Sequence, residues 1–285
     1  MLLGLAKMNW KLLVPVAALM LASVGSASAY TAYIAPRDFT PDGDYAIAEA
    51  AYTTQFFTPQ VGISSPSFHA LRPTGERAAF SSFGVAPTAA TAEMRTTAEG
   101  TYRFSTGEVL GPISNMIFVD GAWRALAAGE VPAEGVDTST LQTVVVAETY
   151  VSKVRPTEAA YANPTGRLAI QPITHPNRIS VASGFEVALL FDGQPFPNMP
   201  FVLYGQGDLE SDLDRTFVTN EQGRATLTFD APGTYVVAIR HRGPAPEGAG
   251  VAVRSYTTTL TFEVVQDLAP IPPPTPPERP RRRRG

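Results

Sequence analysis

Apolar and polar residues alternate with a period of two along much of the chain, and long helical periodicity is missing after residue 29. In the segment 256–264, apolar side chains fall on one face of an extended strand and mostly threonines on the other. The segments 185–191 and 224–229 alternate in the same way. This pattern is typical of half-buried antiparallel β-strands.

Turn-forming residues separate these segments. Asp192-Gly193 follows the segment 185–191, and 220–223 (NEQG) precedes the segment 224–229. Pro232-Gly233 follows Phe229, the last residue of that segment. Strands at a spacing of about eight to twelve residues, with turn signals between them, are typical of β-sandwiches. The sequence therefore predicts an immunoglobulin-like or transthyretin-like β-sandwich over residues 166–265.

The first half of the chain repeats part of this pattern. The segment 98–102 (AEGTY) echoes 231–235 (APGTY), and each opens an alternating stretch after a glycine turn. A further strand is predicted at 143–147 (TVVVA). We therefore expect an all-β protein with two immunoglobulin-like or transthyretin-like β-sandwich domains in tandem, over 30–155 and 166–265, joined by a linker at 156–165.

The N-terminal residues 1–29 have the features of a secretory signal peptide. Lys7 and Lys11 precede an apolar run at 12–21, and 27–29 (ASA) supplies a small-x-small cleavage site, so Tyr30 is the expected mature N-terminus. The apolar run is shorter than the roughly 20 residues that span a bilayer, which disfavours an uncleaved anchor. Because the chain has no cysteine, a lipid-modified N-terminus and disulfides are excluded. We expect a periplasmic protein with no lipid anchor and no transmembrane segment after cleavage.

Charge is distributed unevenly between the body and the C-terminal tail. The chain has 22 Lys and Arg against 26 Asp and Glu, but the signal peptide holds two of the lysines and the tail several of the arginines. The body is therefore acidic, which argues against nucleic acid as a partner.

The tail at 266–285 is rich in proline and arginine, and we expect it to be disordered. Its basic residues are candidates for binding an anionic envelope polymer, and the alternative is a solubilising tail without a partner. These residues are Arg279, Arg281, Arg282, Arg283 and Arg284.

One acidic stretch is a candidate cation site. Asp208, Glu210, Asp212 and Asp214 stand at every second position, so an extended segment would present them on one face. Arg215 stands where an EF-hand loop requires glycine, so the stretch is not an EF-hand. Neighbouring carboxylates could hold a divalent cation weakly, and oxygen ligands favour Ca²⁺ over Ni²⁺ or Co²⁺. The alternative is a solvated acidic strand or loop.

Other catalytic or metal-binding patterns are missing from the sequence. The three histidines, His69, His175 and His241, are far apart in sequence. We expect each to be a structural or surface residue and not a metal ligand. No nucleophile elbow, His-Glu-x-x-His motif or glycine-rich phosphate loop occurs. We therefore expect a protein that is not an enzyme, and a hydrolase with a spatially assembled site is the least favoured alternative.

The order of several short motifs resembles a family of bacterial periplasmic proteins of unassigned function, often labelled as associated with nickel or cobalt uptake. The motifs are 148–150 (ETY) with Lys153, 166–168 (GRL), 192–195 (DGQP), 219–225 (TNEQGRA), 232–235 (PGTY) and 260–262 (LTF). The resemblance implies a non-catalytic accessory or binding protein of an uptake system for nickel, cobalt or another solute. Family members commonly carry a histidine just after the cleavage site, whereas the first histidine here is His69.

Two functions follow from this reading of the sequence. The first is a periplasmic accessory or binding protein that works with an uptake-system or envelope protein. The alternative is a structural or partner-binding envelope protein that docks on anionic surface polymer through its basic tail.

Overall fold

The structure is a computed structural model that describes residues 30–274. The predicted signal peptide and the tail arginines lie outside the described residues. The described part is all-β, as the alternation predicts, with one 3₁₀ turn at Ala159–Tyr161. None of its helical segments has the length and apolar character needed to cross a bilayer.

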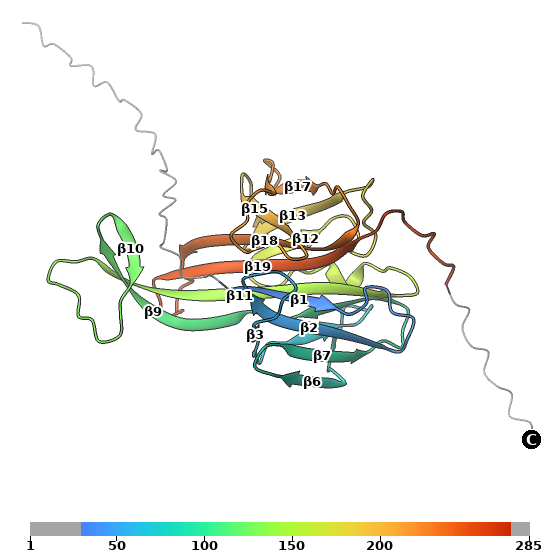
Figure 1. The fold of residues 1–285 in the computed structure, drawn as a ribbon, viewed down its shortest axis with the longest axis horizontal. Helices are drawn as coiled ribbons and strands as arrows, with labels where there is room; N and C mark the ends of the chain where they lie inside the picture. The colour runs from blue at the N-terminus through green and yellow to red at the C-terminus, as the bar shows by residue number, and fades with distance from the viewer. Residues whose placement is uncertain (1–29, 275–285) are drawn as a thin grey trace, which may run out of the picture.

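The strands form three layers, with the largest sheet in the middle (Figure 1). The central sheet has the order β16-β15-β18-β19-β11-β8-β4-β5, and β9 and β10 extend it beside β11. Its strands are β4 (His69–Leu71), β5 (Arg77–Ala78), β8 (Gly100–Ser105), β9 (Val109–Val119), β10 (Ala122–Ala125), β11 (Thr138–Lys153), β15 (Pro200–Gly205), β16 (Thr216–Val218), β18 (Gly233–Pro244) and β19 (Val253–Val264).

A smaller sheet covers each face of the central sheet. The N-terminal sheet consists of β1 (Thr31–Pro36), β2 (Tyr45–Thr53), β3 (Val61–Gly62), β6 (Ser82–Val85) and β7 (Ala90–Arg95). The C-terminal sheet consists of β12 (Leu168–Pro172), β13 (Phe185–Phe191), β14 (Gln194–Pro195) and β17 (Arg224–Leu227).

Alternate residues of the central strands serve different cores. In β18, Val237 and Ile239 pack in the core under the C-terminal sheet. Val236 and Ala238 pack on the opposite side with Tyr33 of β1. Successive side chains of a strand point to opposite faces, so a strand between two layers is apolar on both. The apolar run in this part of the sequence therefore marks a strand that is buried on both faces.

Strands β11 and β19 join the two halves of the chain in one sheet. They pair in parallel from Leu141 with Val253 to Thr149 with Thr261, although more than one hundred residues separate them in sequence. This differs from the expected arrangement of separate sandwiches in tandem. Parallel pairing leaves the N-terminal and C-terminal sheets on opposite faces of the shared sheet, as Figure 1 shows.

The threonine side of 256–264 is buried, whereas the alternation predicts a half-buried strand. Thr259 and Thr261 are fully buried, and the Thr259 hydroxyl donates a hydrogen bond to the Ala32 carbonyl oxygen at 2.8 Å. Strand β1 covers this face, because β19 lies in the middle layer. Thr259 can occupy such a position because its hydroxyl finds a backbone acceptor there, whereas the Thr261 hydroxyl has no hydrogen-bond partner among the described residues.

The echo between 98–102 and 231–235 corresponds to a repeated structural feature. The Tyr102 hydroxyl donates to the Ala98 carbonyl at 2.9 Å, and the Tyr235 hydroxyl donates to the Ala231 carbonyl at 2.8 Å. Each tyrosine follows the glycine that opens its strand, β8 or β18. The arrangement resembles the tyrosine corner of immunoglobulin-like sandwiches. Each half of the chain therefore uses the same local device to begin a central strand.

The segment expected to be a linker packs against the body. Ala160 and Tyr161 are buried, and the Arg103 guanidinium donates to the Asn163 carbonyl at 2.6 Å. Thr157 exchanges hydrogen bonds with Thr101 at 2.9 Å. Residues 156–165 are therefore part of the folded unit, since their backbone and side chains complete the surface of β8.

Candidate functional site

The acidic stretch forms turns after β15 and is not an extended strand. The Asp208 carboxylate accepts a hydrogen bond from the Gly205 amide and forms an ion pair with Arg215. The Asp212 carboxylate accepts a hydrogen bond from the Leu209 amide at 2.9 Å. The regular alternation in the sequence therefore does not place the carboxylates in one row, because local hydrogen bonds fold the segment back on itself.

Glu210 points to a different part of the molecule. Its carboxylate lies 2.7 Å from the Arg240 guanidinium on β18 and accepts a 3.3 Å hydrogen bond from Thr31. Because Thr31 opens β1, this group ties the acidic loop to the start of the N-terminal sheet. Glu210 therefore serves a structural ion pair.

The other acidic residues line a surface hollow, which we call the acidic hollow. It has a volume of about 520 Å³ and is lined by Asp208, Asp212 and Asp214, together with Arg215 and Tyr235. Asp208 is already neutralised by Arg215, so Asp212 and Asp214 provide the remaining negative charge. Among residues 30–274, no group of three or more acidic, histidine or cysteine side chains is arranged to hold a metal ion.

The three histidines lie in separate environments. His69 is buried on β4, where burial and then Arg77 and Arg103 lower its pKa, and its Nδ1 lies 2.9 Å from the Ser67 carbonyl. His241 lies edge-on to Phe191 and Phe196, with ring centroids 4.8 and 5.0 Å away.

His175 belongs to a hydrogen-bonded junction between the halves. Its Nδ1 accepts from the Asn177 amide at 3.1 Å, and its Nε2 lies 2.9 Å from the Thr101 hydroxyl. Burial lowers its pKa to about 4.

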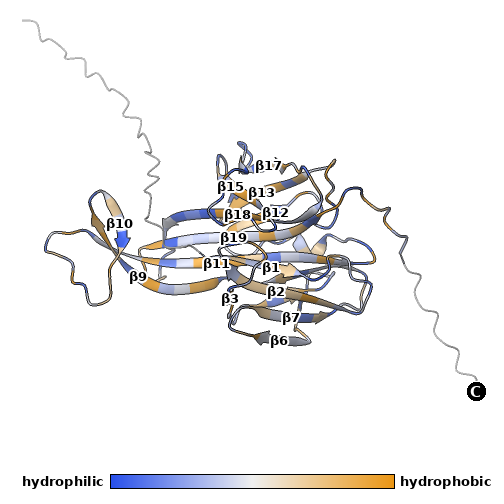
Figure 2. Ribbon diagram, viewed as in Figure 1, coloured by the Kyte–Doolittle hydropathy of each residue, from blue (hydrophilic) through white to orange (hydrophobic). Residues whose placement is uncertain are grey.

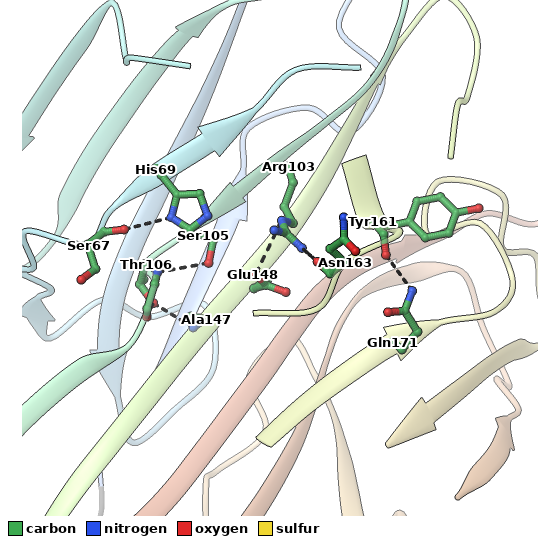
Figure 3. A network of polar contacts seen from close by, with 11 residues as sticks. Ser67, His69, Arg103, Ser105, Thr106, Ala147, Glu148, Tyr161, Asn163 and Gln171 are labelled. Atoms are coloured by element: carbon green, nitrogen blue, oxygen red, sulfur yellow. Dashed lines mark hydrogen bonds and ion pairs between the residues drawn. The ribbon is translucent and has the colours of Figure 1, made fainter. Parts of the chain in front are cut away.

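The structure also contains a buried ionic group that the analysis of the sequence did not identify as a site. Arg103 on β8 and Glu148 on β11 are each only 4 % exposed, and their Nε and Oε1 atoms lie 3.7 Å apart (Figure 3). These two atoms have no hydrogen-bond partner in the described part of the chain. His69 lies nearby on the same face, because both His69 and Glu148 pair with Ser105 in register. An arginine between two aromatic residues of the alternating stretch (TYRFS) was the available sequence signal.

A projecting arm carries several exposed apolar side chains. We use "the arm" for β9, β10 and the start of β11, residues 109–142, which extends beyond the body in Figure 1. Ile113 is 54 % exposed and Val131 85 % exposed, and Leu110 is also exposed. In Figure 2 the ribbon of the arm includes hydrophobic stretches, coloured orange. Several exposed apolar residues on one projecting element make it a candidate interaction surface.

The arginine-rich end of the tail, with Arg279, Arg281, Arg282, Arg283 and Arg284, lies outside the described residues. Binding of an anionic envelope polymer through these residues remains a prediction.

Comparison with known proteins gives a family but no activity. Residues 27–243 match the model of the family described as "Domain of unknown function (DUF4198)". No curated protein matches the chain. Two solved structures match, the D0-D1 domain of Intimin and the D00-D0 domain of Intimin. The first is 12 % identical over 80 % of this chain and 96 % of its own, with a TM-score of 0.20. The second is 10 % identical over 82 % and 99 %, with a TM-score of 0.19, and similarity this low says nothing of function.

Proposed function

Because the chain belongs to the family described as "Domain of unknown function (DUF4198)", we propose a function from the surface of the molecule itself. We propose that it is a non-catalytic periplasmic binding protein that docks a protein of the cell envelope or of an uptake system through the arm. The exposed apolar side chains of the arm are the observation that carries this proposal. The family that the short motifs of this chain resemble is often labelled as associated with nickel or cobalt uptake, and an accessory role of this kind is compatible with that label.

The position of the arm supports a docking role. The arm leaves the three-layered body at the point where β9 pairs with the first half of β11. Its exposed side chains Leu110, Ile113 and Val131 contribute little to the core of the body, so packing does not explain them. Apolar side chains that stay in water lower the solubility of a protein. A partner that covers them removes this apolar surface from water, which is favourable.

Charge substitutions in the arm test the proposal. The exported protein carrying Ile113→Asp and Val131→Asp should lose a partner that cross-links to the wild-type protein in the periplasm. Val218→Asp is the matched control, because Val218 is 57 % exposed on β16, outside the arm. Mass spectrometry would compare the cross-linked proteins. Recovery of the same partner with all three proteins would contradict docking through the arm.

The acidic hollow supports a second candidate function, weak binding of a divalent cation. Asp212 and Asp214 offer only oxygen ligands, which Ca²⁺ prefers over Ni²⁺ or Co²⁺. The affinity should be on the order of 10⁻⁴–10⁻³ M, as in other extracellular calcium modules. Calorimetry should detect Ca²⁺ binding that is lost when Asp212 and Asp214 are both changed to Asn. Tight Ni²⁺ binding that survives these changes would instead assign the metal to one of the histidines.

A further inference from the structure

A small apolar hollow lies at the base of the arm. Its volume is about 130 Å³, and its wall is formed by Met116 of β9, Trp123 of β10, Leu141 of β11 and Val253 of β19. Ser139 and Thr140 of β11 and Arg242 of β18 complete the lining. We call this feature the arm hollow.

Strand register explains why these residues meet on one face. Leu141 pairs with Val253, and Val253 pairs with Pro244, so these three residues point to the same side of the sheet. Arg242 precedes Pro244 by two residues and therefore shares that side. The pairing of Trp123 with Phe118 places the indole beside Met116. Five strands thus build one mainly apolar surface with a cation at its edge.

The cation at this edge is not neutralised by the protein. Arg242 is exposed, and no carboxylate of residues 30–274 lies within ion-pair distance of its guanidinium. Arg240, two residues earlier on the same strand, pairs with Glu210 at 2.7 Å. The arm hollow therefore combines an apolar wall with a free positive charge, and its complement is an apolar group next to a negative charge.

We infer that the arm hollow receives one apolar side chain of a partner protein, with a neighbouring carboxylate of that partner on Arg242. This inference rests on the proposed docking function and names the chemistry of the docked segment. The size of the hollow agrees with it, because an apolar cavity of roughly 150 Å³ accommodates a benzene ring. The neighbouring carboxylate belongs to an acidic residue of the partner or to its C-terminus.

Trp123 provides a direct reporter for this site. The chain has two tryptophans, Trp10 in the predicted signal peptide and Trp123. In the full chain with Trp10→Phe, all tryptophan fluorescence comes from the arm hollow, whether or not the signal peptide is removed. The probe is 3-phenylpropionate, which joins an aromatic ring to a carboxylate, and 3-phenylpropanamide and acetate are its comparison compounds.

We expect 3-phenylpropionate to change the Trp123 emission saturably. It should bind about threefold more tightly than the amide, as an exposed ion pair allows, and acetate should give no saturable change. Arg242→Gln should abolish the preference for the carboxylate but retain binding of the ring. Arg77→Gln is the matched control, because Arg77 is an exposed arginine on the edge strand β5, which does not line the arm hollow.

Three results would overturn the inference. No saturable change with either aromatic probe would show that the hollow takes no side chain. Equal binding of the acid and the amide by the wild-type protein would remove the role of Arg242. A change in emission with protein concentration alone, together with dimers in sedimentation, would show that the occupant is a second copy of the chain.

Failure of this inference can be distinguished from failure of the proposed function. If the arm substitutions abolish cross-linking but the probes do not bind, the docking function stands and the chemistry assigned to the arm hollow is wrong. If the probes bind but the arm substitutions leave cross-linking unchanged, the docking function is wrong and the hollow binds its ligand for another purpose.

Discussion

Arg103 and Glu148 lie in the interior of the protein with their charged atoms 3.7 Å apart. Burial alone would lower the pKa of Arg103, but Glu148 and Tyr150 more than offset this and raise it. Removing charges from water is costly, and mutual attraction offsets that cost only while both partners are present. Each of these residues therefore offsets the cost of burying the charge of the other. Their pairing also gives β8 and β11 a defined relative position.

Single and double substitutions should reveal this dependence. Arg103→Met should reduce the free energy of unfolding by about 3–5 kcal/mol, because it leaves the Glu148 carboxylate buried and unpaired. The double variant Arg103→Met with Glu148→Leu should be more stable than Arg103→Met alone, since no charge remains buried. Urea unfolding measures both. The two residues are not a coupled pair if the double variant is no more stable than Arg103→Met, or if its loss of stability equals the sum of the losses from the two single substitutions.

Protonation of His175 makes the free energy of unfolding depend on pH. The Asn177 amide donates to Nδ1, so the ring proton is on Nε2, and protonation would place a second proton against an N–H donor. The pKa is about 4 in the folded protein and near 6.5 when unfolded, so the unfolded state binds the proton first as the pH falls. This contribution to stability is complete above pH 6.5 and is lost as the pH falls from 6.5 towards 4, by about 1.4 kcal/mol per pH unit.

Urea unfolding of the wild-type protein and of His175→Gln at pH 7 and pH 4.5 measures this contribution. The variant should be less stable at pH 7 but should lose less stability on acidification. The remaining pH dependence includes His69 and His241, whose pKa values are also lowered, in each case chiefly by burial. An identical loss in both proteins would exclude His175 as a source of acid sensitivity.

At the scale of elements, the tyrosine hydrogen bonds at the starts of β8 and β18 show how one short sequence pattern is used twice. Tyr102 and Tyr235 are both buried, and each bonds the carbonyl four residues earlier. Gly100 has φ of +126°, a conformation that favours glycine, and a Cβ there would lie 2.5 Å from Pro73. The glycine and the tyrosine together fix the direction in which each central strand enters the sheet.

Removal of either tyrosine hydroxyl should weaken the fold. Tyr235→Phe should cost about 1 kcal/mol, the usual net value of one hydrogen bond. Tyr102→Phe should cost more, because its hydroxyl also accepts from the Ala98 amide at 3.0 Å. Tyr45→Phe is the control, since Tyr45 is 49 % exposed and should tolerate the change. Thermal unfolding gives the comparison, and equal stability of all three variants would refute a structural role for these hydroxyls.

At the scale of the whole molecule, the parallel seam between β11 and β19 makes the two halves one cooperative unit. Val144 and Tyr150 of β11 belong to the core under the C-terminal sheet, although they precede the C-terminal half in sequence. Strand β1 reaches in the other direction and covers β19 through Thr259. Separation of the halves would expose both sets of side chains and leave two long strand edges unpaired.

Fragments divided after Pro164 should therefore be unfolded when alone. The fragment 30–164 retains β11 but loses the partner strand β19, and the fragment 165–285 loses the apolar side chains of β11. Mixing the two should restore the amide dispersion of the intact chain in a nuclear magnetic resonance spectrum. A well-dispersed spectrum from either fragment alone would show that the halves are independent domains.

The sequence by itself determined the all-β class and several strands of the C-terminal half, because alternation and turn residues are local signals. The expected segment 185–191 coincides with β13, and the segment 143–147 lies within β11. The repeat between 98–102 and 231–235 was also visible, since glycine and tyrosine act within a few residues of each other. These features need no information about distant partners.

Only the tertiary structure decided which faces are buried and which charged groups meet. Period-two alternation gives the sides of a strand but does not reveal that a second sheet covers the threonines of β19. Strand register brings Arg103 and Glu148 together, and the folded acidic loop after β15 brings Glu210 to Arg240 of β18. The same register places Arg242 beside Trp123 and Leu141 at the arm hollow. Pairing over such distances depends on how whole sheets pack, and that information is spread over the entire chain.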